Sequence, residues 1–209
     1  MKPDYWDEAS RALARRDPVL RRLCRQYPEV SLRRRGDAFT TLARAITGQQ
    51  ISVKAAQTVW GRVVKTTGGR PTGLGAPRVL AAHPDALRAA GLSQRKVEYI
   101  RDLAERFVDG RIRPHRWRAM DDEAVIDELV AVKGIGRWTA EMFLMFNLMR
   151  PDVLPVDDIG LQRAAENLYN GGERMTIAEL RALAEPWAPW RTVAVWYLWR
   201  SVDPEPVEY

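Results

Sequence analysis

Residues 134–136 read Gly-Ile-Gly and separate two segments whose apolar residues recur with helical spacing. Before the glycines, Val125, Leu129 and Val132 form one apolar stripe, and a second helix is predicted to begin near Arg137. Glycines let the backbone approach a ligand closely, and a helix N-terminus presents N–H groups suited to a phosphate. The segment therefore predicts two helices joined by a tight turn, which serves either as a phosphate clamp or as a simple corner between helices.

The rest of the chain also has helical periodicity. Phe39, Leu42 and Ile46 have the spacing of one buried helix face. Residues 67–77 are too rich in glycine and proline to continue a helix and are predicted to be a loop. Further helices are predicted to start near Ser52, Ser93, Asp121 or Asp122, Asp158 and Thr176, the last with Glu179 at capping-box spacing. Convincing alternating strands are absent from the sequence, so the predicted fold class is all-α.

Composition narrows the possible partners and cofactors. The net charge is +6, and most basic residues are arginine, which favours polyanionic partners unless these residues only solvate the surface. Cys24 is the only cysteine and there are two histidines, which excludes an intramolecular disulfide, a cysteine zinc site and a four-cysteine iron–sulfur cluster. No apolar stretch approaches the length of a membrane span, and the first residues do not read as a signal peptide. The sequence thus predicts a cytoplasmic protein.

Four segments resemble DNA glycosylases of the helix–hairpin–helix/GPD superfamily. Residues 132–140 (VKGIGRWTA) resemble the hairpin of that superfamily, and residues 154–158 (LPVDD) resemble the segment that ends in its essential aspartate. Residues 46–56 (ITGQQISVKAA) and 187–191 (WAPWR) are similar to the bacterial 3-methyladenine DNA glycosylase II branch. The chain begins almost directly at the helical core, so it resembles compact members without an additional N-terminal domain.

The resemblance implies an organisation for the chain. Residues 1–209 would form one catalytic unit of two helical lobes around a central cleft. Residues 38–122 would form an inner lobe. Residues 1–37 and 123–209 would form the second lobe, which contains the hairpin (residues 129–147) and the catalytic aspartate.

By the register of the resemblance, Asp158 falls on the catalytic position and Asp157 on the residue before it. Hydrolysis of an N-glycosidic bond builds positive charge on the sugar, which an ionised carboxylate stabilises. Adjacent aspartates cannot flank a bond as paired carboxylates do. One carboxylate suffices when the leaving base is already cationic, as an alkylated purine is. We therefore expect Asp158 to be catalytic and Asp157 to be a helix N-cap, although either could serve as the cap.

The resemblance also implies a base pocket, formed by Trp138, Trp199, Met142 and Ile159. Indole rings can stack on a flipped base and favour a cationic one. Trp138 stands where strand-cleaving relatives carry a lysine, and tryptophan cannot form a Schiff base, so no AP-lyase activity is expected. Gln50 is expected to fill the space left by the flipped base.

The remaining expected contacts lie at the hairpin and at a helix start. Gly134, Ile135, Gly136, Arg137 and Lys133 are expected to bind DNA phosphate, with Ile135 anchoring the hairpin in the core. Arg95 and Lys96 are either further phosphate contacts or solvated surface residues. The backbone carbonyls of Val130, Val132 and Gly134 are candidate ligands for a structural Na+ or K+, and no other cofactor is expected.

The expected function is that of a monofunctional DNA glycosylase of base excision repair that leaves an abasic site. Its expected substrates are 3-methyladenine and 7-methylguanine in double-stranded DNA, with ethenoadenine and hypoxanthine as further candidates. It is expected to act as a monomer, without an obligate protein partner or a membrane, at the bacterial nucleoid. Two alternatives remain: a non-catalytic helix–hairpin–helix DNA-binding protein, and a related glycosylase for a different damaged base.

Overall fold

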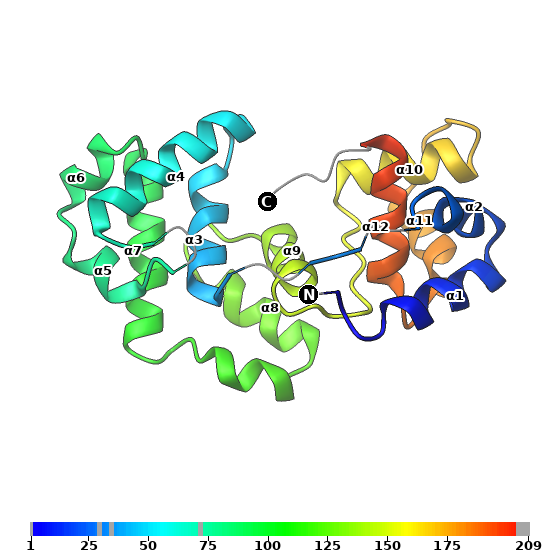
Figure 1. The fold of residues 1–209 in the computed structure, drawn as a ribbon, viewed down its shortest axis with the longest axis horizontal. Coiled ribbons are helices and arrows are strands. Elements are labelled where there is room, and N and C mark those ends of the chain that lie inside the picture. Colours follow the sequence, from blue (N-terminus) through cyan, green and yellow to red (C-terminus); the bar gives the residue numbers. More distant parts are fainter. Residues whose placement is uncertain (1, 29–30, 34–35, 71–72, 204–209) are drawn as a thin grey trace. The chain divides into compact units, whose positions relative to one another are not determined.

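The computed structural model describes residues 2–28, 31–33, 36–70 and 73–203. Within these ranges the chain forms α-helices, two short 3-10 helices and loops without a β-strand, apart from one isolated bridge between Arg70 and Gly73 (Figure 1). The predicted all-α class is therefore confirmed. The described residues contain no helix that is both long and apolar enough to cross a membrane.

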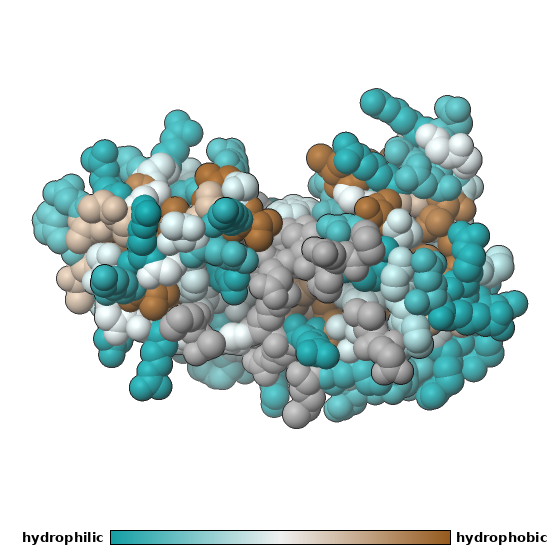
Figure 2. Space-filling view, turned by 45° about the horizontal axis from the view of Figure 1, so that its top comes forward, coloured by the Kyte–Doolittle hydropathy of each residue, from teal (hydrophilic) through white to brown (hydrophobic). Residues whose placement is uncertain are grey.

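The chain divides into two compact units. Unit 1 contains the described residues up to Arg33 and those from Leu144 onward, and unit 2 contains Gly36–Phe143. Helix α9 (Arg137–Phe146) begins in unit 2, and its C-terminal end belongs to unit 1. In the view of Figure 2, apolar groups lie scattered among hydrophilic residues on both units, as is usual for protein surfaces.

Unit 1 is built around its last helix, α12, whose residues Thr192 to Arg200 are all buried. Helices α1, α2 and α10 pack against it. Trp6 meets Trp196 edge to face, with ring centroids 5.2 Å apart. The elements of unit 1 are α1 (Trp6–Arg16), α2 (Pro18–Gln26), α10 (Ile159–Tyr169), α11 (Ile177–Ala184), η2 (Glu185–Trp187) and α12 (Arg191–Val202).

Helices α1 and α2 are elements that the sequence analysis did not locate. Asp17 separates them, because its backbone is extended and its side chain accepts the N–H groups of Val19 and Leu20. Pro18 occupies the first position of α2, where the missing N–H is not needed. The other Asp17 oxygen accepts hydrogen bonds from Tyr169 and Trp187. One aspartate thus caps α2 and ties it to two other parts of unit 1.

Unit 2 is centred on α7, which packs against α3, α5 and α6. The predicted N-caps Ser52, Ser93 and Asp121 are confirmed, since each side chain accepts an N–H of the first turn that follows it. The elements of unit 2 are α3 (Ala38–Gly48), α4 (Val53–Thr67), α5 (Ala76–Ala81), α6 (Pro84–Ala89), α7 (Gln94–Val108), η1 (Pro114–Ala119), α8 (Asp122–Val130) and the start of α9.

The two units are not divided where the expected lobes were, because residues 123–143 belong to unit 2. Two contacts explain why the hairpin lies with unit 2. The backbone N–H of Lys133 donates to Asp102 of α7 at 2.9 Å, and the rings of Trp117 and Phe143 meet edge to face at 5.2 Å. The central cleft between lobes stays a prediction.

Candidate active site and DNA-contact elements

The turn between α8 and α9 uses its two glycines differently. Gly134 has φ +79°, and a Cβ there would lie 2.1 Å from a ring carbon of Tyr99, so no larger residue fits. A Cβ at Gly136 would meet nothing within 4 Å. Ile135 is buried, which confirms its expected place in the core. Gly134 is thus required by the fold, whereas Gly136 leaves the backbone open to a ligand.

Helix α9 begins directly after this turn. The N–H of Ala140 donates to the carbonyl of Gly136 at 3.1 Å, so Gly136 precedes the first helical turn. First-turn N–H groups have no partner within their own helix and form a suitable site for an anion. The Lys133 N–H is not available in the same way, because it donates to Asp102.

Arg137 is engaged by carboxylates. Its guanidinium donates to both oxygens of Glu123 and to Glu141 at 3.0 Å. The hydrogen bond with Glu123, together with the charge of both acids, raises the pKa of Arg137 above its usual value. Arg137 therefore braces α8 against α9, and its expected contact with phosphate stays a prediction.

The turn after α3 is held by the side chain of Lys96 from α7 and by that of Gln49, a residue of the turn itself. The half-buried Lys96 ammonium donates to the carbonyls of Thr47 at 2.8 Å and Gln49 at 2.7 Å, and burial lowers the pKa of Lys96. Gln49 donates its side-chain amide to the carbonyl of Gly134 at 2.8 Å. The structure shows a role of Lys96 that was not expected, as a cap on α3, and its possible contact with phosphate stays a prediction.

Gln50 is an exposed residue of this turn. Its φ is +59°, which is uncommon for a residue other than glycine. Ile51 and Val53, which follow it, are also exposed. The hydrogen bonds of Lys96 and Gln49 hold the backbone just before Gln50. The Gln50 side chain therefore faces solvent from a backbone that is held in place.

The hairpin carbonyls expected to bind a cation already take part in hydrogen bonds. The Val132 carbonyl accepts the N–H of Ile135 at 3.1 Å, and the Gly134 carbonyl accepts Gln49. A carbonyl oxygen has two lone pairs, so these bonds still leave capacity for a monovalent ion. The cation site at Val130, Val132 and Gly134 stays a prediction. Among the described residues, no cluster of histidine, cysteine, aspartate and glutamate could hold a metal.

In unit 1, Asp158 is the N-cap of α10 and only 6% exposed. Its Oδ1 accepts the N–H of Leu161 and the indole N–H of Trp199, each at 2.7 Å. The expectation that Asp157 caps this helix was wrong, because the extended residue that reaches the first turn is Asp158. Capping and catalysis do not exclude each other here, since the cap fixes the orientation of the carboxylate.

Two residues that the sequence analysis missed complete the surroundings of this carboxylate. A Cβ at Gly160 would lie 3.1 Å from Asp158 Oδ1 and 3.3 Å from the Trp199 ring, so glycine allows the carboxylate and indole to approach the helix. Phe146 stacks on Trp199 with centroids 6.0 Å apart and planes 10° apart. A glycine in the first turn of a helix was the available sequence signal. Phe146 had no such signal.

The expected base-pocket residues fall into two groups. Trp199 is buried and bonded to Asp158, while Ile159, the next residue after Asp158, is exposed in unit 1. Trp138 and Met142 lie four residues apart on α9 in unit 2, hence on one helix face, with Trp138 exposed and Met142 buried. The joint pocket of all four residues stays a prediction.

The described chain is helical, with two glycines in the turn between α8 and α9 and a capped, buried aspartate at the start of α10. The model of the HhH-GPD superfamily of base excision DNA repair proteins matches residues 43–189, and the chain belongs to this family.

Individual relatives point to one branch of the family. The chain is 34% identical over 169 residues to DNA-3-methyladenine glycosylase 1 of Schizosaccharomyces pombe, covering 79% of this chain and 72% of the relative. It is 34% identical over 179 residues to DNA-3-methyladenine glycosylase 2 of Escherichia coli, covering 82% of this chain and 60% of that protein.

Two solved structures that are similar to this chain are also of enzymes named for 3-methyladenine. The crystal structure of a DNA-3-methyladenine glycosidase from Bacillus halodurans is similar with a TM-score of 0.86 and 39% identity, over 93% of this chain and 89% of the other. A 3-methyladenine DNA glycosylase of Schizosaccharomyces pombe in complex with abasic DNA has a TM-score of 0.81 and 28% identity, over 97% of this chain and 98% of the other.

Proposed function

We propose that the protein is a monofunctional DNA glycosylase of base excision repair that hydrolyses the N-glycosidic bond of alkylated purines. The observation that carries this proposal is Asp158, a nearly buried carboxylate that two donors hold in one orientation. The relatives named as DNA-3-methyladenine glycosylases support the substrate class. Its substrates would be 3-methyladenine and 7-methylguanine, with ethenoadenine and hypoxanthine as further candidates.

In this proposal the Asp158 carboxylate stabilises the positive charge that develops on the sugar as the bond to the base breaks. The donors from Leu161 and Trp199 fix the carboxylate before the reaction, so little reorganisation is needed. An alkylated purine leaves as a neutral base because it already carries a positive charge. A second carboxylate to protonate the leaving group is then unnecessary.

The other site residues bind and hold DNA in this proposal. The N-terminus of α9 and the turn at Gly136 bind a backbone phosphate. Gln50 enters the base stack where the damaged nucleotide has been flipped out. Trp138 stacks on the flipped base, and because tryptophan offers no amine for a Schiff base, the protein hydrolyses the base without cleaving the strand.

The proposed partner is double-stranded DNA that contains alkylated bases. One family structure is a complex with abasic DNA, which supports a product of that kind. We place the protein as a monomer in the bacterial cytoplasm, at the nucleoid, without an obligate protein partner. Its single cysteine fits a reducing compartment, where disulfides are rare.

A base-release assay tests this proposal. The protein is incubated with duplex DNA carrying N7-methylguanine, and free base and abasic sites are measured, with strand cleavage recorded before and after alkali. We expect free 7-methylguanine, and strand breaks only after alkali. No base release under conditions in which a known glycosylase is active would overturn the enzyme assignment. Breaks without alkali would overturn the monofunctional assignment alone.

A further inference from the structure

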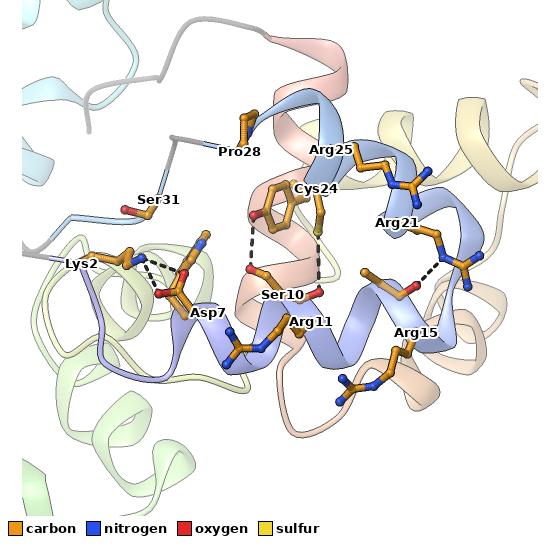
Figure 3. Close-up of a pocket in the computed structure, with 13 residues that line it drawn as sticks. Lys2, Asp7, Ser10, Arg11, Arg15, Arg21, Cys24, Arg25, Pro28 and Ser31 are labelled. Carbon is orange, nitrogen blue, oxygen red and sulfur yellow. Dashed lines mark hydrogen bonds and ion pairs between the residues drawn. The ribbon is translucent and has the colours of Figure 1, made fainter.

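A pocket of about 580 Å³ opens between α1 and α2 in unit 1 (Figure 3). Its floor is polar: the hydroxyls of Ser10 and Tyr197 are 3.2 Å apart, and the thiol of Cys24 donates to the carbonyl of Ser10 at 3.9 Å. Burial raises the pKa of Cys24, and it raises that of Tyr197 to about 12, so both are neutral at pH 7. The volume is in the range of small-ligand sites.

The residues around this floor are strongly basic. Five basic side chains and one acidic one line the pocket, and the acid, Asp7, is paired with Lys2 at 2.7 Å. Arg21 donates to the carbonyl of Ala14 but keeps its charge. The other basic residues are Arg11, Arg15 and Arg25, and no carboxylate pairs with any of them within the described ranges. A pocket with this excess of positive charge attracts anions.

The arginines form two rows. Arg11 and Arg15 are one helical turn apart on α1, and Arg21 and Arg25 are one turn apart on α2. Figure 3 shows their guanidinium groups pointing in different directions, with that of Arg15 directed away from α2 and none of the four lying over Cys24. Cations spread in this way suit a ligand with several phosphates better than a single phosphate ion. Guanidinium groups also match phosphate oxygens in bidentate geometry.

The pocket is distinct from the candidate catalytic residues of unit 1. Tyr197 lines the pocket, whereas Trp199 binds Asp158. Residues two positions apart on a helix point about 200° apart, so the two side chains leave α12 on opposite faces. The matched family segment, residues 43–189, includes neither α1 nor α2.

We propose that the pocket between α1 and α2 binds a run of phosphate groups, carried by the backbone of bound DNA or by a free polyphosphate. On the DNA backbone it would hold a strand through unit 1, in addition to the hairpin of unit 2. This proposal does not depend on the chemistry of base excision, so its test uses no activity measurement.

Cys24 reports on the pocket, because it is the only cysteine and lies on the floor. The rate of its alkylation by N-ethylmaleimide, a neutral reagent, is measured by mass spectrometry in the whole protein. Inorganic tripolyphosphate, an undamaged 20-base-pair duplex and poly-glutamate are compared at equal ionic strength. We expect at least fivefold slower alkylation with a phosphate ligand. Protection by the duplex alone identifies the DNA backbone, and protection by tripolyphosphate identifies a free polyphosphate.

A double variant, Arg11→Gln with Arg15→Gln, removes one row, and Arg22→Gln is the matched control. All three arginines are exposed, and Arg22 lies on α2 without lining the pocket. We expect protection to be lost in the double variant and kept in the control. If DNA is the ligand, the slope of log K against log salt falls by about 1.8, at about 0.9 per phosphate contact. Protection by neither phosphate ligand, equal protection by poly-glutamate, or protection unchanged in the double variant would overturn the proposal.

Discussion

The candidate carboxylate in unit 1 and the candidate DNA-contact turns in unit 2 are built by different means. Asp158 is nearly buried, and a backbone N–H and an indole N–H hold it. The turns at Gly134 and Gln50 are exposed and take their shape from backbone angles with positive φ.

This difference separates the expected effects of mutation. A buried, hydrogen-bonded carboxylate is suited to chemistry, since its position is fixed before substrate arrives. Exposed turns are suited to contact, but their backbone shape needs support from residues such as Tyr99 and Lys96. Changes in unit 1 should therefore act mainly on the rate of base release. Changes in unit 2 should act mainly on folding, DNA affinity and the flipping of the damaged base.

The largest expected effect on stability is that of Gly134→Ala. An alanine Cβ would overlap the Tyr99 ring, and the residue would also need a left-handed backbone, so the free energy of unfolding should fall by about 2–5 kcal/mol. Gly136→Ala is the matched control, because nothing lies within 4 Å of a Cβ there. Urea unfolding of both variants checks this. Equal stability of the two would show that the glycines do not differ as described.

Trp199→Phe should act on both stability and chemistry. It keeps a ring against Phe146 but removes the N–H donated to Asp158, which should lower the free energy of unfolding by about 1.5–3 kcal/mol. A loosened carboxylate should slow base release about tenfold, equivalent to ~1.4 kcal/mol. Trp60→Phe is the control, since the buried Trp60 N–H has no partner among the described residues. An equal loss of activity in both variants would contradict a role for the indole hydrogen bond.

Lys96→Met should have a smaller effect, confined to the turn after α3 that contains Gln50. The carbonyls of Thr47 and Gln49 would lose their charged donor, lowering the free energy of unfolding by about 1–2 kcal/mol and weakening DNA binding. Arg95→Met, at an exposed neighbour on α7, should leave the free energy of unfolding unchanged. Thermal unfolding and DNA titration measure stability and DNA binding. If the two variants weaken DNA binding equally, Lys96 acts only through its charge.

Gln50→Gly should have the smallest effect on stability, with the opposite sign. Relief of the left-handed backbone at φ +59° should raise the free energy of unfolding by about 0.5 kcal/mol. Loss of the side chain that fills the base stack should nevertheless slow base release about tenfold. Urea unfolding of the variant tests the expected gain in stability, and its single-turnover rate tests the expected loss of base release. Unchanged activity would remove Gln50 as the wedge.

Much of the fold could be predicted from local signals. Ser52, Ser93 and the Thr176–Glu179 capping box mark helix starts through short-range hydrogen bonds, which depend only on neighbours in the sequence. The unit boundary could not be predicted in the same way. It depends on long-range contacts such as that of Asp102 with Lys133, which no local pattern encodes.

The residues of the candidate site could be named from the sequence, but their hydrogen bonds could not. The family resemblance indicated the hairpin and both aspartates, but the choice of N-cap was wrong because it depends on the backbone angles around Asp158. The bonds of Lys96 and Gln49 join residues distant in sequence, so they emerged only from the structure. Gly160 gave a weak signal in the sequence, as a glycine within a helix. The structure explains this glycine, because a Cβ there would lie 3.3 Å from the Trp199 ring.

The central claim is that Asp158 alone supplies the catalytic charge, and Asp158→Asn tests it most directly. Asparagine is a good N-cap, and its side-chain oxygen can still accept from Leu161 and Trp199, so the fold should be kept while the charge is lost. In single-turnover assays on N7-methylguanine duplex, the account predicts a rate at least about 100-fold lower with DNA affinity unchanged. Asp157→Asn should retain the parent rate. Full activity of Asp158→Asn, or a loss of activity in Asp157→Asn instead, would contradict the account.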